Sequence, residues 1–358
     1  MKVSFVSSQA ISQAMRYQTA RLQADLSKAT KEMGSLRVAD VGLALGARTS
    51  ISVSLHREID RLKGITDSNE LAATRLKTTQ VGLQQLTEAA GELLSNYSTA
   101  LSDTASPTIV QQQAAKVLNL MSSVLNTNLN GENIFAGINT DVTPFNDFLD
   151  PASPNRIAFD DAFAEAPPTG FGFGFGPNDP AAADITKAQM EAFLENIERQ
   201  FFAQPPDDDW KGNWSNATDQ QITSRITLTE TAQTSVSANI PGFRKLALAA
   251  ATVAATFDGA LSSEARAAIL EHGIKFLGEA VSDLSNQQGY TGIVEQRLSK
   301  ANERLSMQVD LFNNSIRDLE GVDEFEAAAR ITGLKTQLEV SYSLTASMQK
   351  LSLLNYLS

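Results

Sequence analysis

The sequence contains no cysteine. This absence excludes disulfide bonds, thiolate metal sites and a cysteine nucleophile, but it does not fix the redox compartment. No run approaches the roughly 18 apolar residues of a membrane-spanning helix. The amino-terminal residues also lack the continuous apolar stretch of a cleavable signal peptide. We therefore expect neither a membrane anchor nor a cleaved signal.

Positive charge is scarce too. The 358 residues include 29 Lys and Arg against 41 Asp and Glu, which gives a net charge of −12. Proteins that bind nucleic acid use cationic surface to displace counterions, and docking on anionic lipid needs the same kind of surface. The charge balance therefore argues against nucleic acid and against membrane as partners.

Proline is missing from both ends of the chain, since all 11 prolines lie between Pro107 and Pro241. Because proline interrupts helix interiors, the two ends are free to form long helices. Both tryptophans, Trp210 and Trp214, lie in the middle. We predict a mainly α fold with a small α+β insert: a long antiparallel helical rod made from both chain ends, with a central inserted domain.

This division predicts five segments. They are an N-terminal helix of an inner terminal domain at 1–45, rod helices at 46–138, a variable and partly β insert at 139–240, helices that return to and complete the rod at 241–319, and a C-terminal helix of the inner terminal domain at 320–358. Within them, apolar periodicity predicts helices at about 50–102, 108–129, 185–202 and 243–286. An Ile- and Thr-rich stretch at 221–230 predicts a strand.

Apolar residues at three-four spacing form stripes at both chain ends, as in a coiled coil. A single stripe can pack on the core of its own domain, but a rod has little core, so the two ends most simply cover each other. The final stretch, LSLLNYLS at 351–358, is apolar where chain ends are usually solvated. The candidate subunit-interface residues are Ile11, Met15, Leu22, Leu26, Leu344, Leu351, Leu354 and Leu357.

No group of side chains predicts catalysis. His56 and His272 each stand alone, and neither lies in a zinc-peptidase motif, so we expect a surface or packed histidine in each case. The alternating glycines at 170–176 lack the sequence that ends a phosphate loop, and we expect a surface loop that is flexible or packed by its aromatics. The run at 207–209 lacks the spacing of a calcium loop and predicts a solvated acidic turn. We expect no cofactor, no metal site and no enzyme activity.

Three stretches resemble the flagellin family. The first is SLRVAD at 35–40, which follows the amino-terminal heptads. The second is NLNGENIFAGINTD at 128–141, and the third runs from about 297 to the end and includes SLLNYL at 352–357. The resemblance covers roughly 1–145 and 290–358 and leaves out the insert. The turn DVGLALGAR at 40–48 departs from the more polar turn of the family.

The resemblance implies an extracellular structural subunit of the bacterial flagellum, exported by the flagellar type III apparatus without a cleaved signal. Its ending is more similar to subunits at the hook–filament junction than to filament flagellin. The implied partners are copies of itself, the hook-side junction protein, flagellin, and an export chaperone on the C-terminal region. The resemblance also implies terminal helices that fold as they assemble, because short isolated helices are marginal in water.

Other interpretations remain open. A filament flagellin has the same architecture. An enzyme domain carried on the insert is a second alternative, although the catalytic motifs are missing. A helical adaptor or sensor unrelated to flagella is a third, and it predicts terminal helices that are already ordered in the monomer.

Overall fold

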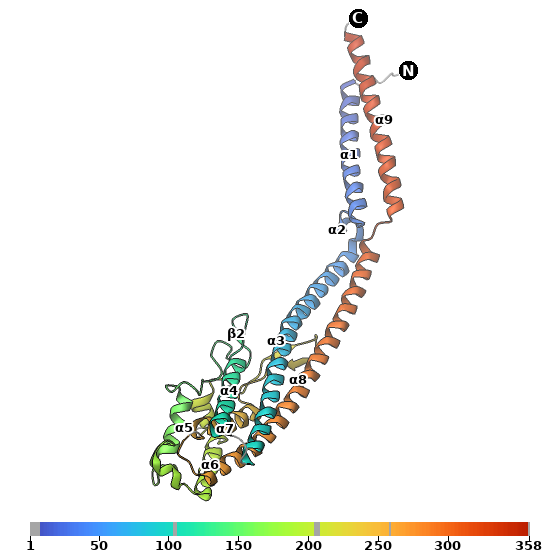
Figure 1. Cartoon of the computed structure of the whole chain (residues 1–358). Coiled ribbons are helices and arrows are strands. Elements are labelled where there is room, and N and C mark those ends of the chain that lie inside the picture. Colours follow the sequence, from blue (N-terminus) through green and yellow to red (C-terminus); the bar gives the residue numbers. More distant parts are fainter. Residues whose placement is uncertain (1–7, 103–105, 204–207, 258, 357–358) are drawn as a thin grey trace. The chain divides into compact units, whose positions relative to one another are not determined.

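The computed structural model describes residues 8–102, 106–203, 208–257 and 259–356. The chain forms two compact units: unit 1 comprises Met1–Gly64 and Arg304–Ser358, and unit 2 comprises Ile65–Glu303. Two long helices, α3 (Thr49–Leu101) and α8 (Ser263–Glu320), contribute to both units. Figure 1 shows that helices account for most of the chain. The predicted fold class, with long helices from both ends and a small insert, is confirmed.

Unit 1 is built around the two ends of the chain. Helix α1 (Ser8–Ser35) and helix α9 (Glu324–Tyr356) lie side by side (Figure 1). After α1 come the short helix α2 (Val41–Leu45) and the single turn η1 (Gly46–Arg48). The side chain of Asp40 caps α2 by accepting from the Leu43 amide at 2.9 Å. Helix α8 ends at Glu320, and α9 begins four residues later at Glu324.

Helix α3 is continuous, although three glycines lie inside it. A β-carbon at Gly82 would approach Cγ1 of Val124 to 2.8 Å, so a side chain there would push away the neighbouring helix. At Gly64 and Gly91 a β-carbon would meet nothing within 4 Å. These two glycines lower helix propensity by about 1 kcal/mol each, which the packing of the long helix overcomes.

The core of unit 2 is centred on α7 (Pro241–Thr256), most of whose side chains are buried. It packs against α4 (Pro107–Leu125), as Figure 1 shows. The helix predicted at 108–129 ends earlier, because the side chain of Asn126 bonds both the amide and the carbonyl of Phe145. The helix predicted at 243–286 is two helices, with a break after Thr256 before α8 begins.

Two small antiparallel ladders lie in unit 2. Strand β1 (Asn128–Leu129) pairs with β2 (Glu132–Asn133), and β3 (Thr223–Arg225) pairs with β4 (Thr231–Gln233). The strand predicted at 221–230 is therefore wrong in length. The chain turns back after β3, where the Ile226 amide donates to the Glu230 carbonyl at 2.9 Å.

The insert packs its aromatics inside. Its helices are α5 (Pro154–Ala164), α6 (Lys187–Phe201), the 3-10 helix η2 (Pro180–Asp184) and the π-turn η3 (Trp210–Trp214). Helix α6 begins at a capping box, in which Thr186 and Gln189 satisfy each other's amides. The glycine-alternating loop packs by its aromatics: the ring of Phe173 lies 4.9 Å from Phe163 and 5.3 Å from Phe193.

The acidic run before the first tryptophan is not a solvated turn. Asp208 is buried and forms an ion pair with Arg244 at 3.2 Å. Asp209 accepts from Asn213 and from the Trp214 indole, and burial raises the pKa of its carboxyl. The prediction of a solvated acidic turn is therefore wrong for both residues. The adjacent tryptophan side chains are buried, so this segment of the backbone lies at the core. Asp207 lies outside the described residues.

Candidate assembly surface

Helices α1 and α9 pack along a seam whose positions follow a heptad repeat on both helices. Each seam position is at least half-buried, and the helices contact one another along their lengths. The positions are Met15, Thr19, Leu22, Leu26, Ala29 and Met33 on α1, and Ala327, Ile331, Leu334, Leu338, Ser341 and Thr345 on α9. Such a repeat is typical of a two-stranded coiled coil.

On α9 the seam becomes polar toward the free end of the helix. Ser341 and Thr345 take the last two described seam positions on α9. The hydroxyl of Thr345 lies 4.0 Å from the sulfur of Met15, and the side-chain amide of Gln23 donates to the Tyr342 hydroxyl at 2.7 Å. A groove of about 250 Å³ lies here between the helices. Polar seam positions bury little apolar area, so this part of the pair is weakly held.

Two apolar side chains that line this groove are exposed: Val340 is 53% exposed and Leu344 is 49% exposed. Tyr17 on α1 is 74% exposed. A large apolar residue exposed alone is ordinary, but here several lie on one helix pair, beside the polar end of its seam. The terminal pair therefore presents apolar surface that the single chain does not cover.

The eight predicted interface residues fall in three different places. Ile11, Met15, Leu22 and Leu26 lie on α1, half-buried or buried. Leu344 is exposed on α9. Leu351 and Leu354 lie in the last turns of α9, where the structure describes the helix but not the side chains, and Leu357 lies outside the described residues.

Sequence reasoning missed a pair of ion pairs at the base of the terminal helices. Glu32 of α1 is 5% exposed. Its carboxylate accepts from the Ala39 amide at 3.2 Å and pairs with Arg330 of α9 at 3.2 Å. The sequence does place this glutamate next to the apolar seam, between Ala29 and Met33, and that position could have indicated a charged partner on the other helix.

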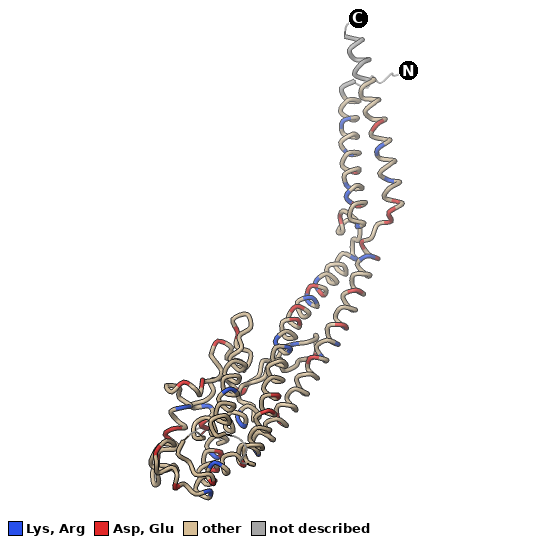
Figure 2. Tube along the Cα trace, in the orientation of Figure 1, with Lys and Arg blue, Asp and Glu red and all other residues tan. Residues whose placement is uncertain are grey.

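The second ion pair joins the same two segments with the charges reversed. Glu320, at the end of α8, is 4% exposed. Its carboxylate accepts from the Ser52 hydroxyl and lies 3.7 Å from the Arg37 guanidinium and 3.9 Å from the His56 ring. We call Glu32–Arg330 and Arg37–Glu320 the crossed ion pairs. Figure 2 shows charged residues of both signs near this turn.

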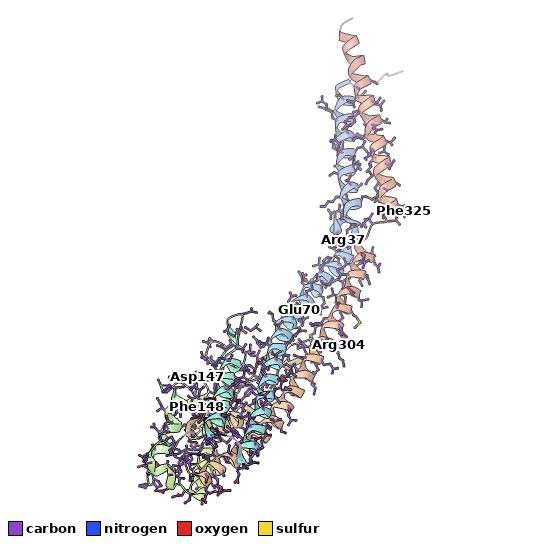
Figure 3. The ribbon with its side chains drawn as sticks, viewed as in Figure 1. Arg37, Glu70, Asp147, Phe148, Arg304 and Phe325 are labelled. Atoms are coloured by element: carbon purple, nitrogen blue, oxygen red, sulfur yellow. The ribbon has the colours of Figure 1, made fainter. Side chains whose placement is uncertain are left out.

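Two exposed apolar side chains flank the crossed ion pairs. Phe325, at the start of α9, is 86% exposed, and Leu43 in α2 is 76% exposed. Figure 3 shows Phe325 at the outer edge of the α9 start and Arg37 nearer the middle of the turn. Each follows a capping aspartate, Asp323 or Asp40, that fixes the local backbone. These side chains add to the uncovered apolar surface of unit 1.

His272 lies in unit 2 and takes no part in the crossed ion pairs. Its ring packs against Phe276 and lies 3.4 Å from Glu198. Burial lowers the pKa of His272 and outweighs the opposing effect of the Glu198 hydrogen bond. Among the described residues there is no group of three or more His, Cys, Asp or Glu side chains that could hold a metal ion.

A second groove lies in unit 2 between α3 and α4. It measures about 250 Å³ and is lined by residues of both signs, including Glu88, Glu92 and Lys116, around Leu93 and Val117.

In the part of the chain that the structure describes, no helix is long and apolar enough to cross a membrane.

Two family models match the chain. The bacterial flagellin N-terminal helical region matches residues 6–140, and the bacterial flagellin C-terminal helical region matches residues 274–357. The two matched regions together cover more than half of the chain and contain α1 and α9. None of the curated proteins compared with the chain matches it.

A solved structure shares the fold. It is that of a protein described as a flagellar hook-associated protein from Vibrio parahaemolyticus, and it matches with a TM-score of 0.50. The two sequences are 9% identical, and the match covers 76% of this chain and 97% of the other. At this identity the likeness concerns the fold alone.

Proposed function

The chain belongs to the flagellin family, and we propose that within it the protein forms the junction between the hook and the filament, the role of hook-associated protein 3. As a family member it is a structural subunit of the extracellular flagellum, serves motility and is not an enzyme. It assembles with other axial proteins of the flagellum. Its place at the junction, as opposed to the filament, is the part of this assignment that we propose.

The observation that carries the proposal is the uncovered apolar surface of the terminal pair. Leu344 and Val340 are exposed beside a seam that has become polar at Ser341 and Thr345. Neighbouring subunits can bury such side chains at about 25 cal/mol per Å² of apolar area. A monomeric adaptor has no reason to keep this surface, whereas a subunit of an axial assembly needs it.

The choice of the junction over the filament rests on the resemblance of two stretches. The ending SLLNYL at 352–357 is more similar to junction subunits than to filament subunits. The turn at 128–133 forms the β1–β2 hairpin, in which the Gly131 amide donates to the Asn128 side chain at 2.8 Å. This hairpin precedes the FAG motif that the resemblance includes.

We also propose that the terminal helices complete their folding during assembly. Ordering a residue costs about 1–2 kcal/mol, and the weakly held end of the α1–α9 seam returns little of that cost in the single chain. Contacts with neighbouring copies, with flagellin and with the hook-side junction protein supply the rest. The same exposed surface would need protection before assembly, so an export chaperone on the C-terminal region and type III export without a cleaved signal are part of the proposal.

Immunogold labelling of intact flagella tests the junction role. We expect antibody against the insert, residues 139–240, to label a short zone where the hook meets the filament. Deletion of the gene should leave hooks without attached filaments, and the full-length chain should restore them. Label along the whole filament would instead identify a filament flagellin, the alternative with the same architecture.

A further inference from the structure

The α1–α9 seam alone does not define its own register. Seam positions recur every seven residues on both helices. Sliding one helix past the other by one heptad, about 10 Å at 1.5 Å per residue, therefore lays seam positions on seam positions again. Coiled coils of this kind commonly need a polar or charged residue to select one register.

The crossed ion pairs are not periodic, so they distinguish the observed register from a slipped one. Each segment supplies one acid and one base, and each acid meets the base of the other segment: Glu32 meets Arg330 at 3.2 Å and Arg37 meets Glu320 at 3.7 Å. A displacement of about 10 Å carries both pairs beyond ion-pairing distance together. The two carboxylates are then left in a buried position without their arginines.

Burial makes that loss costly. Glu32 and Glu320 are 5% and 4% exposed, while both arginines are half-exposed. Removing the partner of a buried charge is strongly destabilising, although water at the arginine side screens part of the interaction. A slipped register therefore loses much more stabilising interaction at this turn than in the seam.

Main-chain bonds hold the same turn together. The Val38 amide donates to the Glu320 carbonyl at 2.8 Å, and the Val322 amide donates to the Leu36 carbonyl at 3.1 Å. Between them lies Gly321, where an added β-carbon would fall 2.4 Å from the carbonyl oxygen of Arg317. The charged side chains and the backbone therefore bring together the same two segments, one from each end of the chain.

We propose that the crossed ion pairs set the register in which the two ends of the chain pair, and that α1 and α9 extend from this fixed turn. Glu32, Arg37, Glu320 and Arg330 act as positioning residues. Their role belongs to the single chain and holds whether the subunit occupies the junction or the filament. The apolar seam supplies attraction, and the crossed ion pairs supply alignment.

Engineered cysteines can read the register, because the natural chain has none. Met15→Cys with Thr345→Cys reports the observed register, since those side chains are in contact. Met15→Cys with Leu338→Cys and Leu22→Cys with Thr345→Cys report slips of one heptad in either direction. Disulfide yield under mild oxidation of the purified full-length monomer gives the ratio of in-register to slipped pairs. A ratio does not depend on how much of the helix pair is formed at any moment.

The variants are Glu32→Gln and Glu320→Gln, which keep the side-chain shape and remove the charge. Glu326→Gln is the matched control, because Glu326 pairs with the same Arg330 at 2.8 Å but within α9, and it is exposed. We expect the parent and the control to favour the observed register about tenfold, and each test variant to lose most of that preference. The double variant Glu32→Gln with Arg330→Gln should keep at least as much preference for the observed register as Glu32→Gln alone.

Fluorescence of Trp210 and Trp214 verifies that unit 2 of each variant is folded, and the helical content from circular dichroism verifies that the helices of unit 1 are kept. Three results would overturn the proposal: a parent without register preference, test variants that retain the parent's ratio, or a control that loses the ratio as much as they do. The measurement uses the free chain alone, so it stands apart from the test of the junction role.

Discussion

The hydroxyl of Tyr97 donates to the main-chain carbonyl of Ala249 at 3.1 Å and ties the C-terminal end of α3 to α7 in unit 2. The whole side chain is buried, and burial raises the pKa of the phenol well above its ordinary value. The ring also lies where a β-carbon at Gly273 would approach it to 2.8 Å, so α8 passes close to α3 at this point. One tyrosine therefore joins three helices of the core.

Tyr97→Phe should lower the free energy of unfolding of unit 2 by about 1 kcal/mol, because the buried Ala249 carbonyl loses its bond from the tyrosine hydroxyl while the ring packing is kept. Urea unfolding followed by tryptophan fluorescence measures the change. Tyr290→Phe is the matched control, since Tyr290 also donates from its hydroxyl, to Gln233 at 3.2 Å, but is 45% exposed. Equal losses in the two variants would contradict the role given to burial.

Gly273→Ala should destabilise the same core for a steric reason. The new methyl group would fall 2.8–2.9 Å from two carbons of the Tyr97 ring, and overpacking of this kind costs about 1–3 kcal/mol. The loss should be seen in the same urea transition. Gly278→Ala on the same helix is the control, because a β-carbon there meets nothing within 4 Å. It should leave the protein as stable or slightly more stable, since alanine favours the helix.

Acidification should destabilise unit 2 through His272. Burial lowers the pKa of this imidazole below its ordinary value of 6.5. The unfolded chain then binds the proton more readily than the folded chain, so stability present above pH 6.5 is lost as the pH falls through that value. Urea unfolding at pH about 7.5 and about 5.5 should show a larger loss for the natural protein than for His272→Gln.

The control for this prediction is His56→Gln. His56 lies in unit 1 and its side chain is 46% exposed. The tryptophan transition reports unit 2, so His56→Gln should keep the pH dependence of the natural protein. If His272→Gln kept it as well, the titrating group would lie elsewhere.

The sequence predicts the long helices well and the short elements poorly, for physical reasons. Proline-free ends with heptad stripes leave a long helix as the main way to bury apolar residues, so α3 is predictable even across internal glycines. The helix predicted at 243–286 contains only the first part of α8. The strand at 221–230 is different. Its propensity is real, but the hairpin pairing of residues 223–225 with residues 231–233 sets where the strand ends.

The candidate site shows the same limit. The seam residues on α1 follow from spacing, whereas the crossed ion pairs join residues about 300 positions apart in the chain, and no local pattern links Glu32 to Arg330. Asp208 illustrates the point in unit 2: its burial depends on the ion pair with Arg244, which lies 36 positions further along the chain. Composition indicates that acidic residues are present, but only the fold decides which of them are covered.

Limited proteolysis of the free monomer should trim both chain ends and leave a stable fragment of roughly residues 45–320, because weakly packed terminal segments open most readily. The polar end of the α1–α9 seam is the physical reason. Mass spectrometry of the digest gives the fragment boundaries, and the assembled protein is the comparison. Equal protection of the ends in the monomer and in the assembly would contradict coupled folding and assembly.

Leu344→Asp should leave the melting transition of the monomer unchanged within about 0.5 kcal/mol, as expected for an exposed position, but it should prevent incorporation into flagella. A charge placed on surface that neighbouring subunits cover must be desolvated without a partner. Incorporation is measured by restoration of filaments in a strain that lacks the gene, alongside calorimetry of the purified chain. Asp substitutions of Leu351, Leu354 and Leu357 should behave in the same way.

Thr332→Asp supplies the control for this last prediction. Thr332 is also exposed on α9, but it lies outside the groove that Leu344 lines, and its hydroxyl donates to the Ala328 carbonyl at 2.9 Å. If the effect of Leu344→Asp came from added charge on α9 as such, both variants would fail to assemble. If Leu344 belonged to the core of the monomer, its variant would lose the melting transition as well. Assembly lost in Leu344→Asp alone, with the monomer intact, identifies Leu344 as part of the surface that a neighbouring subunit covers.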